Sequence, residues 1–420
     1  MFSTPRSPLG RILDRHAEAL IAEALTDTRV VLVVGARQSG KSTVVAQVTP
    51  SDREWRSLDN AAMRQAAKAD PVTFVSHPGL LVIDEIQREP DLLLAIKETV
   101  DADPRPGRFL LTGSAHVLSL RSVPDALPGR IETIELWPLS QGEIDGTPDG
   151  FVDAVFDAGP DYRHESDLTR DDYIARIVRG GFPEAVARSG RRRERFFENY
   201  VGDLVNRDVI QVSAIEHGPQ MRRLIRLLAA RSGGLAVPGT LAGDLGISRP
   251  TVESYLALLE QVFLVKRVPA WTRNLSARAV RTPKLFFVDS GIAADQLSQD
   301  ETSLQRLDSP LGALLEGFVT SEIARQLTWS RTRAEIFHYR TKDQVEVDIV
   351  LEDRRGRVIA IEVKAAATVR AEDFRGIDHL AQRTGDDLVT GIVFYTGQRT
   401  LSFGPKKLAV PISALWESQQ

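Results

Sequence analysis

The sequence predicts a mixed α/β protein built from several domains. The chain has 420 residues, which exceeds one ordinary hydrophobic core and predicts two to four domains. Short β-branched runs such as Val30–Val34 alternate with helical patterns near the N-terminus, and a helix followed by a strand hairpin is expected near the C-terminus. Hydrophobic residues make up 42% and charged residues 26%, a balance that excludes a disordered chain.

Composition also excludes several kinds of chemistry. The chain has no cysteine, so disulfides, cysteine-ligated zinc, iron–sulfur clusters and thiol nucleophiles are excluded. This composition fits a reducing compartment. No apolar run approaches the ~18 residues needed to cross a bilayer. The first residues, Met1–His16, lack the apolar centre of a signal peptide. We therefore expect a cytoplasmic protein with no membrane partner.

A phosphate-binding loop follows the first apolar run. The segment Gly35–Thr43 reads GARQSGKST and fits the pattern G-x-x-x-x-G-K-[ST] between a strand and a helix. Its glycines allow backbone N–H groups to face phosphates, and the following helix adds its positive end. Lys41 is expected to reach the β- and γ-phosphates, and Ser42 to offer a hydroxyl to Mg²⁺. The residues expected to bind ATP are Gly35, Arg37, Gln38, Ser39, Gly40, Lys41, Ser42, Thr43 and Asp84.

A second apolar run, Gly79–Ile83, ends in two carboxylates, as in a Walker B motif. Carboxyl ends of parallel strands point into the ligand crevice of an α/β sheet. Asp84 is expected to hold Mg²⁺ through water, because Mg²⁺ loses its waters reluctantly. Glu85 is placed to polarise the attacking water, which favours hydrolysis of ATP. The alternative is a nucleotide that is bound and never hydrolysed.

A third strand, Arg108–Ser114, ends in hydroxyl side chains. In AAA+ enzymes the corresponding strand carries a polar residue, sensor 1, that orients the water. Thr112 or Ser114 fits this role, and the alternative is that both cap the segment that follows. Further on, Arg130 is a candidate arginine finger that reaches the γ-phosphate in a neighbouring subunit. The alternative for Arg130 is an ordinary surface arginine.

The middle of the chain contains a basic window. The net charge is −4, yet residues Met221–Lys284 hold eleven Lys and Arg against three Asp and Glu. Such an asymmetry predicts a basic face on an acidic protein, or otherwise a solvated surface helix. Before this window, the acidic segment Gln141–Glu165 is rich in Gly, Asp and Pro and is predicted to be a linker or a lid insertion.

Two short helices joined at Gly246 are predicted inside the window. Ser248 suits the N-cap of the second helix, and Val252, Tyr255, Leu256 and Leu259 share its buried face. Two strands and a basic loop around Trp271 follow, which together indicate a winged helix-turn-helix. Such a module binds DNA or docks to a protein. The residues expected to contact DNA are Arg249, Thr251, Ser254, Arg273, Arg278 and Arg281.

The C-terminal region combines a helix, a hairpin and a short acidic motif. Asp348 and the run Glu362-Val-Lys364 form D-x₁₃-E-x-K on a predicted hairpin, and Glu316 lies on the preceding helix. Period-two alternation places Glu362 and Lys364 on one face beside Asp348. Glu316, Asp348 and Glu362 are therefore expected to bind Mg²⁺, while Lys364 assists the attacking water. This is the nuclease chemistry of the PD-(D/E)xK fold, whose domains also occur as binding platforms without cleavage.

The chain resembles a family of bacterial and archaeal AAA-superfamily P-loop ATPases with a C-terminal domain of unknown function. The residues that carry the resemblance are GARQSGKST at 35–43, LLVIDEIQ at 80–87, LLTGSA at 110–115, GRIETIELWPLS at 129–140, GGFPE at 180–184, FFVDSGIAA at 286–294, YRTKDQVEVDIV at 339–350 and IEVK at 361–364. The resemblance covers nearly the whole chain. It implies ATPase activity, homo-oligomers based on hexamers or dimers, and action on branched or structured DNA.

We expect four domains in this α/β chain. They are an AAA+ P-loop core with a parallel sheet at 1–150, a helical lid or linker at 151–215, a winged helix-turn-helix at 216–295 and a restriction-endonuclease-like domain at 296–420. The leading hypothesis is an ATPase that binds or remodels structured DNA with ATP and Mg²⁺. Alternatives are an ATP-gated, Mg²⁺-dependent endonuclease and a nucleotide-switched regulator whose winged helix binds protein.

Overall fold

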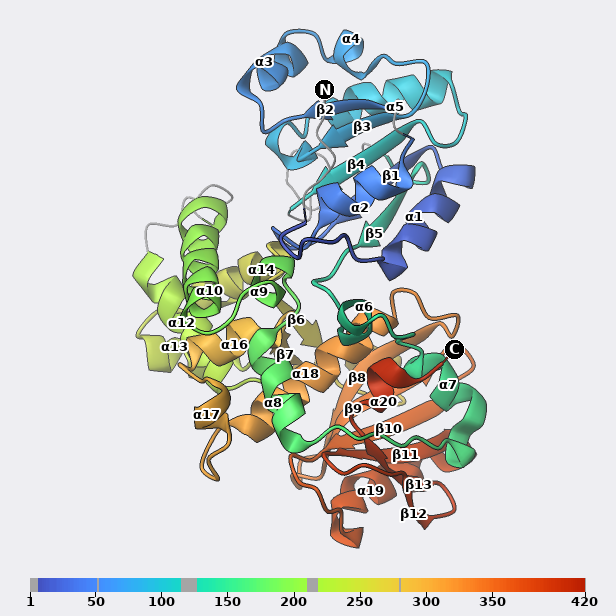
Figure 1. The fold of residues 1–420 in the computed structure, drawn as a ribbon, viewed down its shortest axis with the longest axis vertical. Coiled ribbons are helices and arrows are strands. Elements are labelled where there is room, and N and C mark those ends of the chain that lie inside the picture. Colours follow the sequence, from blue (N-terminus) through green and yellow to red (C-terminus); the bar gives the residue numbers. More distant parts are fainter. Residues whose placement is uncertain (1–6, 51–52, 115–126, 210–217, 279–280, 420) are drawn as a thin grey trace. The chain divides into compact units, whose positions relative to one another are not determined.

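A computed structural model describes residues 7–50, 53–114, 127–209, 218–278 and 281–419. The chain divides into two compact units, residues 1–139 with 261–263 (unit 1) and residues 140–260 with 264–420 (unit 2). Figure 1 shows the elements of each unit in chain order. In the described part of the chain, no helix is both long enough and apolar enough to cross a membrane.

Unit 1 is built on a five-stranded sheet with the strand order β2-β3-β4-β1-β5, in which every pair is parallel. The prediction of an N-terminal parallel α/β sheet is confirmed. The elements of unit 1 are α1 (His16–Asp27), β1 (Val30–Val34), α2 (Lys41–Val48), β2 (Glu54–Ser57), α3 (Ala61–Ala69), α4 (Pro71–Val75), β3 (Leu81–Asp84), η1 (Ile86–Arg88), α5 (Leu92–Ala102), β4 (Phe109–Gly113) and β5 (Ile131–Glu135).

The core of unit 1 explains why these segments fold as they do. The five apolar residues of β1 are all buried, as expected for a strand covered on both faces. Ile21 of α1 and Val44 of α2 pack with Val31, Val33 and neighbouring strand residues in one cluster. The edge strand β5 was not predicted, because its mixed sequence IETIE has only one buried residue.

Unit 2 holds a six-stranded mixed sheet with the order β12-β13-β11-β10-β9-β8 and a two-stranded sheet of β6 and β7. The elements of its first part are α6 (Gln141–Asp145), α7 (Phe151–Ala158), η3 (Gly159–Asp161), α8 (Arg170–Arg179), α9 (Pro183–Val186), α10 (Arg191–Asp203), η4 (Leu204–Val209), α12 (Gly218–Ala230), α13 (Pro238–Leu245), α14 (Arg249–Gln261), β6 (Val265–Val268), α15 (Leu275–Arg278) and β7 (Lys284–Phe287). The elements of its second part are α16 (Ser290–Gln296), α17 (Glu301–Leu304), α18 (Leu311–Gln326), β8 (Ala334–Arg340), β9 (Glu346–Asp353), β10 (Val358–Val363), η5 (Ala371–Phe374), α19 (Arg375–Thr384), η6 (Gly385–Asp387), β11 (Leu388–Tyr395), β12 (Leu401–Gly404), β13 (Lys407–Pro411) and α20 (Ala414–Glu417).

The helix predicted near the C-terminus is α18, and the predicted hairpin is formed by β9 and β10. Strand β9 pairs antiparallel with β10 on one side and with β8 on the other. Strands β10, β11 and β13 are parallel, so the sheet is mixed. Ile377 and Leu380 of α19 pack on the face formed by Val347, Val350 and other strand residues. Phe151 of α7 packs against Phe394 of β11, with ring centroids 5.0 Å apart.

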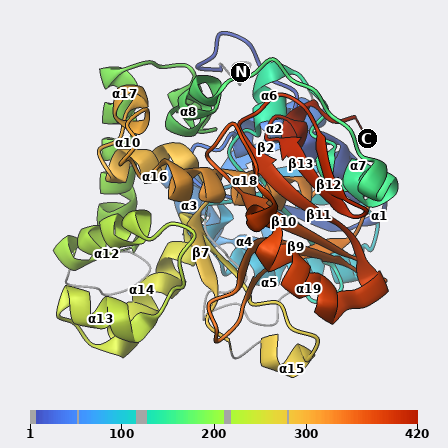
Figure 2. The same cartoon turned by 90° about the horizontal axis from the view of Figure 1, so that it is seen from below.

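The helices α12, α13 and α14 form a group of their own beside the six-stranded sheet, with β7 between them and the sheet (Figure 2). Gly246 adopts a left-handed conformation at the end of α13, and the Ser248 hydroxyl accepts the Thr251 N–H at the start of α14. The predicted buried face of α14 is confirmed, since Val252, Tyr255, Leu256 and Leu259 are all buried. The interpretation of this group as a DNA-binding winged helix stays a prediction.

The prediction that Gln141–Glu165 is a linker or lid insertion is wrong. Phe151 and Val152 are fully buried within unit 2, and the Val152 N–H donates to the Gln326 side chain at 3.2 Å. The Asp153 carboxylate accepts the backbone N–H groups of Arg331 and Thr332. The acidic and glycine-rich composition therefore reflects buried capping and turn residues, which resemble those of a solvated linker in composition.

Candidate functional site

The phosphate-binding loop joins β1 to α2. Gly35, Gln38 and Gly40 have φ angles of 157°, 60° and 100°, so the backbone curls as a phosphate nest requires. A Cβ on Gly35 would lie 2.1 Å from the Leu136 carbonyl oxygen, which excludes any larger residue. Among the other predicted loop residues, Ser39 is buried, Arg37 and Thr43 are half-buried, and Gln38 is exposed.

Lys41 lies inside this curl. Its side chain is nearly buried, and Nζ donates to the Gly35 and Ala36 carbonyl oxygens at 3.1 and 2.9 Å. Arg15, at the start of α1, supports the loop from outside. Its guanidinium donates to the Ser39 carbonyl at 3.0 Å and to the Trp137 carbonyl at 2.7 Å. Both cations therefore hold loop backbone, and only Lys41 lies within the nest.

Asp84, at the end of β3, is surrounded by hydroxyl groups that donate hydrogen bonds to it. Its carboxylate accepts the Ser42 hydroxyl at 3.1 Å and the Thr112 hydroxyl at 2.6 Å. Because β4 lies between β1 and β3, Thr112 at the end of β4 reaches Asp84 directly. Burial raises the pKa of Asp84, and the hydrogen bond from Thr112 opposes that rise.

Glu85 is held by the same strand ends. Its backbone N–H donates to the Thr112 hydroxyl at 3.0 Å, and its carboxylate accepts the Ser114 hydroxyl at 3.2 Å. The Gln87 amide contacts the same carboxylate and donates to the Ser114 oxygen at 2.8 Å. Glu85 also has φ 61°, an uncommon conformation for a residue other than glycine. Thr112 and Ser114 thus both take part in positioning the carboxylates; any capping role toward residues 115–126 lies outside the described residues.

These side chains fit a Mg²⁺–nucleotide. A serine hydroxyl beside a carboxylate supplies the hard oxygen ligands that Mg²⁺ prefers, with further positions left for water and phosphate. The loop backbone and Lys41 supply hydrogen-bond donors for phosphate. The predicted nucleotide residues come together, whereas their individual roles stay predictions.

Arg130 lies just before the start of β5, at the end of the sheet strands that is opposite to the phosphate loop. Val30 at the start of β1 pairs with Ile131, and the loop begins after Val34. About four strand residues, or about 13 Å along the strand, therefore separate Arg130 from the start of the phosphate loop. Arg130 forms a bidentate ion pair with Asp101, at 2.5 and 3.1 Å. It therefore does not act on the phosphate loop of its own chain.

The residues predicted to contact DNA divide into two groups. Arg249 and Ser254 are exposed on α14, where Arg249 pairs with Glu253 at 2.8 Å, and Thr251 is half-buried at the helix start. The predicted wing loop instead packs against the six-stranded sheet. The Trp271 N–H donates to the His338 carbonyl at 2.6 Å, and the Trp271 ring is part of the sheet's core.

The prediction that Arg278 faces DNA does not fit its surroundings. Its side chain is 14% exposed, pairs with Glu352 at 2.5 Å and lies over the Phe337 ring. Arg273 donates to the Thr384 carbonyl and pairs with Asp387. Arg278 therefore attaches the loop to the sheet. Its ion pair with Glu352 and its contact with the Phe337 ring hold the side chain against the sheet and away from solvent.

A cavity of about 820 Å³ lies where this loop meets the β8–β9 turn and α19. Three of its cationic residues, Arg281, Lys342 and Arg383, are exposed and form no ion pair among the described residues. Arg273 and Arg340 also line it, and among the described residues of the lining Asp343 alone is acidic. The cavity is therefore suited to an anionic ligand.

The predicted nuclease carboxylates do converge, but around a lysine. Lys284, the first residue of β7, places Nζ 2.7 Å from Glu316, 2.7 Å from Glu346 and 3.4 Å from Asp348. The Lys284 side chain is only 5% exposed. Burial alone would lower the pKa of Lys284, yet the carboxylates of Glu316, Asp348 and Glu346 raise it above its usual value.

Glu362 and Lys364 complete this carboxylate cluster, which we define as Glu316, Glu346, Asp348 and Glu362 with their two lysines. Lys364 pairs with Glu362 at 3.0 Å, and the Val363 N–H donates to Asp348 at 3.0 Å. Burial, followed by the Asp348 charge, raises the pKa of Glu316 to about 8 and that of Glu362 to about 7. Four acids share two ammonium groups, and Glu316 and Glu362 therefore keep their protons to a higher pH than an ordinary glutamate does.

The carboxylate cluster does not fit a metal ion as it stands. Across the described ranges, no group of three His, Asp or Glu side chains is arranged to hold a metal. Mg²⁺ requires oxygen ligands at about 2.0–2.1 Å, and the Lys284 ammonium takes the position between three of the acids. The predicted metal role of Glu316, Asp348 and Glu362 is therefore not supported by this geometry.

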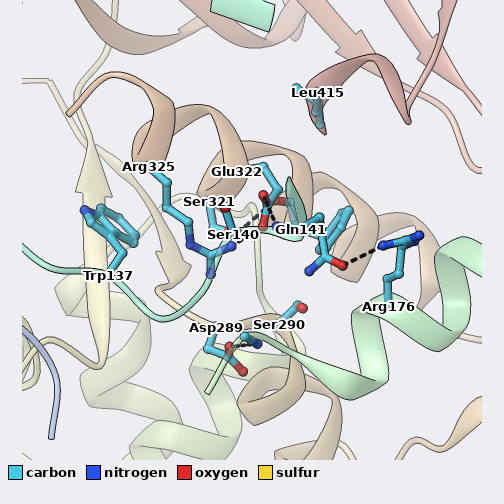
Figure 3. Close-up of polar contacts among 12 residues, drawn as sticks. Trp137, Ser140, Gln141, Arg176, Asp289, Ser290, Ser321, Glu322, Arg325 and Leu415 are labelled. Carbon is cyan, nitrogen blue, oxygen red and sulfur yellow. Dashed lines mark hydrogen bonds and ion pairs between the residues drawn. The ribbon is translucent and has the colours of Figure 1, made fainter. Parts of the chain in front are cut away.

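Two sequence motifs without an assigned role meet in a buried polar network (Figure 3). Asp289 caps α16 through the Gly291 and Ile292 N–H groups and also accepts the Gly181 N–H at 2.6 Å. A Cβ on Gly180 would lie 2.3 Å from the Asp289 carboxylate, which explains the glycine. The motifs at 180–184 and 286–294 therefore form one structural joint in unit 2.

Glu322 and Arg325 of α18 extend this network. They form a buried ion pair; Arg325 donates to the Val288 carbonyl at 2.8 Å, and Glu322 accepts the Gln141 N–H at 3.1 Å. Burial raises the pKa of Glu322 to about 7. Sequence reasoning did not identify Arg15, Lys284, Glu322 or Arg325. Of these four residues, Glu322 and Arg325 offered the one signal, an acid and a base three positions apart on the same helix.

Comparisons with known families agree with this organisation. A model described as an AAA domain matches residues 27–145. Two domains of unknown function, DUF8612 and DUF4143, match residues 170–303 and 311–415. The AAA match contains the phosphate loop and both carboxylates of Asp84 and Glu85, and the DUF4143 match contains the acids of the carboxylate cluster.

Similar proteins and structures were also found. An uncharacterized Mycobacterium tuberculosis protein is 29% identical over 84% of this chain and 74% of that protein. A Haemophilus influenzae protein is 23% identical over 63% of this chain and 69% of that protein. The Walker-type ATPase of Pyrococcus abyssi covers 70% of this chain and 99% of its own, with 14% identity and a TM-score of 0.44. A Thermotoga maritima RuvB structure covers 63% of this chain and 93% of its own, with 18% identity and a TM-score of 0.29. The family matches support an AAA-superfamily P-loop ATPase with a C-terminal DUF4143 domain.

Proposed function

We propose that this protein hydrolyses ATP with Mg²⁺ in unit 1 and couples hydrolysis to binding or remodelling of DNA by unit 2. The observation that carries the proposal is the arrangement of Asp84 and Glu85. Asp84 accepts the Ser42 and Thr112 hydroxyls, and Glu85 is held by Ser114 at the neighbouring strand end. Two carboxylates held in adjacent, fixed positions can take different roles: Asp84 would bind the metal ion, and Glu85 would activate water.

Each side chain has one role in this proposal. Lys41 and the loop N–H groups bind the phosphates, which requires Lys41 to exchange its carbonyl partners for phosphate oxygens. Ser42 and Asp84 would hold Mg²⁺, which supplies charge neutralisation at the phosphates when bound. Glu85 orients a water molecule and accepts its proton, and Thr112 and Ser114 keep both carboxylates in register.

The basic cavity of unit 2 supports DNA as the partner. Phosphates of nucleic acid are bound mainly by Arg and Lys, and Arg281, Lys342 and Arg383 lie together on its wall. The exposed α14 residues Arg249 and Ser254 offer a second candidate surface. We propose branched or structured DNA as the ligand class, which rests on the family resemblance.

An ATPase assay with and without duplex, single-stranded and four-way-junction DNA tests the coupling. We expect hydrolysis to rise with at least one of these ligands. An unchanged rate with all three would favour the alternative of a nucleotide-switched regulator that binds protein. No hydrolysis at all, with ATP bound, would contradict the ATPase proposal itself.

Salt dependence locates the DNA-binding surface. The triple variant Arg281→Ala/Lys342→Ala/Arg383→Ala should weaken binding and flatten the slope of log K against log salt by roughly 0.9 per lost duplex phosphate contact. Arg306→Ala, an exposed arginine paired with Asp308 away from the cavity lining, is the matched control. If Arg249→Ala flattens the slope and the triple variant does not, α14 is the DNA-binding surface.

We also propose that the protein works as a homo-oligomer in which Arg130 acts on a neighbouring subunit. Arg130 would have to leave Asp101 to reach a γ-phosphate. Arg130→Ala should then keep ATP binding and lose hydrolysis, and mixing it with Lys41→Ala protein should restore some activity. Full activity of Arg130→Ala alone would leave the Asp101 ion pair as its only role.

A further inference from the structure

The position of Lys284 carries an inference that is independent of the ATPase proposal. Lys284 belongs to β7, whereas its carboxylate partners belong to α18 and β9. Its ammonium is within hydrogen-bonding distance of Glu316 and Glu346, both at 2.7 Å, and lies 3.4 Å from Asp348. A single buried cation therefore joins three acids that come from two separate segments of the chain.

The backbone fixes this cation in place. Lys284 pairs with Val268 in the β6–β7 sheet and forms a bridge with Leu235 on its other side. The preceding loop is bound to β8 through the Ala270–His338 bridge. A change of rotamer alone would therefore leave the Lys284 ammonium without its three acidic partners, because the side chain is almost fully buried.

We propose that the Lys284 ammonium takes the place of a divalent cation in the carboxylate cluster. The cluster then binds no metal and cleaves no DNA, and it serves to tie β7 to the six-stranded sheet. The same acids become a metal site once the ammonium is removed. Glu362 supports this second half, because its Oε2 atom is buried without a hydrogen-bond partner among the described residues.

The role of Lys284 differs from that expected of Lys364. Lys364 pairs with Glu362 alone and is 34% exposed, so its ammonium lies at the margin of the cluster. Lys284 contacts three acids and is 5% exposed. Removing Lys364 leaves the central cation in place, which makes Lys364→Ala the matched control.

Mn²⁺ binding to the full-length, nucleotide-free protein tests the proposal. All proteins carry Asp84→Asn, so that the ATPase site does not contribute a metal ligand. With Lys284 present we expect no site in the micromolar range by electron paramagnetic resonance of free Mn²⁺. Lys284→Ala should gain one site, which the further change Asp348→Asn should weaken at least tenfold. Lys364→Ala should gain none.

Two outcomes of the binding measurement overturn the proposal. One is Mn²⁺ binding by the protein with Lys284 intact that is weakened by Asp348→Asn. The other is a folded Lys284→Ala protein, checked by circular dichroism, that gains no site. If Lys284→Ala does not fold, Lys284→Met keeps the length of the side chain without its charge, and the measurement with Lys284 intact still decides the first half. Plasmid nicking with Mn²⁺ by the protein with Lys284 intact, if Asp348→Asn abolishes the nicking, would also overturn the proposal.

Discussion

The two units each bring acidic side chains and lysines close together, yet the two sites differ in what the acids contact. In unit 1, Asp84 and Glu85 are hydrogen-bonded to neutral hydroxyls, and Lys41 bonds to loop carbonyls. In the carboxylate cluster of unit 2, Glu316, Glu346 and Asp348 surround the Lys284 ammonium. The first arrangement leaves negative charge available for a cation, and the second has already supplied the cation.

This difference shows that the acids alone do not define a metal site. A hydroxyl partner fixes a carboxylate without neutralising it. The negative charge of the carboxylate therefore stays available to bind Mg²⁺. An ammonium partner in a buried position satisfies both the charge and the hydrogen bonds. The residue that decides between the two cases in unit 2 lies outside the D-x₁₃-E-x-K motif.

The largest expected effect concerns the site in unit 1. Glu85→Gln should lower kcat of ATP hydrolysis by roughly 10²- to 10⁴-fold while ATP still binds, because it removes the proton acceptor. Lys41→Ala should instead weaken ATP binding by roughly 10- to 100-fold, since it removes a charge-assisted hydrogen bond to phosphate. Nucleotide affinity and single-turnover rates separate the two, and an equal loss of affinity in both variants would show that this division of roles is wrong.

The next effect concerns the stability of the carboxylate cluster. Lys284→Ala leaves several buried acids without a central cation, and it should lower the free energy of unfolding by about 3–5 kcal/mol. Lys364→Ala removes a partly exposed partner of Glu362 and should lower it by about 1 kcal/mol or less. Urea unfolding at pH 7 measures both. Equal losses would mean that the central position of Lys284 carries no special weight.

The pH dependence of stability gives a third test. Burial, and then the Lys284 charge, lower the pKa of His338 to about 4 from 6.5. His338 therefore contributes stability that is present above pH 6.5 and is lost as the pH falls to 4, by at most ~3 kcal/mol. His338→Gln should show a smaller loss of stability over this range. In Lys284→Ala the pKa of His338 should move toward 6.5, which NMR titration can follow.

The smallest effect concerns a hydroxyl in unit 1. Thr112→Val removes both the hydrogen bond to Asp84 and the acceptor for the Glu85 N–H, so we expect kcat to fall by roughly tenfold, or ~1.4 kcal/mol. The acid limb of the pH–rate profile should move to higher pH, because the Thr112 hydrogen bond lowers the pKa of Asp84. Thr112→Ser keeps the hydroxyl and should restore most of the rate. An unchanged profile in Thr112→Val would exclude Thr112 from the site.

Much of the fold could be predicted because burial leaves a local signal. The apolar runs in β1, β3 and β4 and the spacing of Val252, Tyr255, Leu256 and Leu259 on α14 correspond to buried positions. Segments that mix polar and apolar residues gave wrong or missing predictions. The sequence pattern does not predict strand β5, and the composition of Gln141–Glu165 predicts a linker although Asp153 caps backbone N–H groups inside unit 2.

The sequence alone determined the phosphate loop, the paired carboxylates of Asp84 and Glu85, and the acids of the second cluster, because each motif is continuous or nearly so along the chain. Only the tertiary structure decided which cations face those acids. Lys284 is 64 residues from Asp348 along the chain, and Arg15 is 24 residues from the loop carbonyl that it contacts. Charge neutralisation depends on distance in space and on exclusion of water, and neither quantity is recorded in the order of the residues.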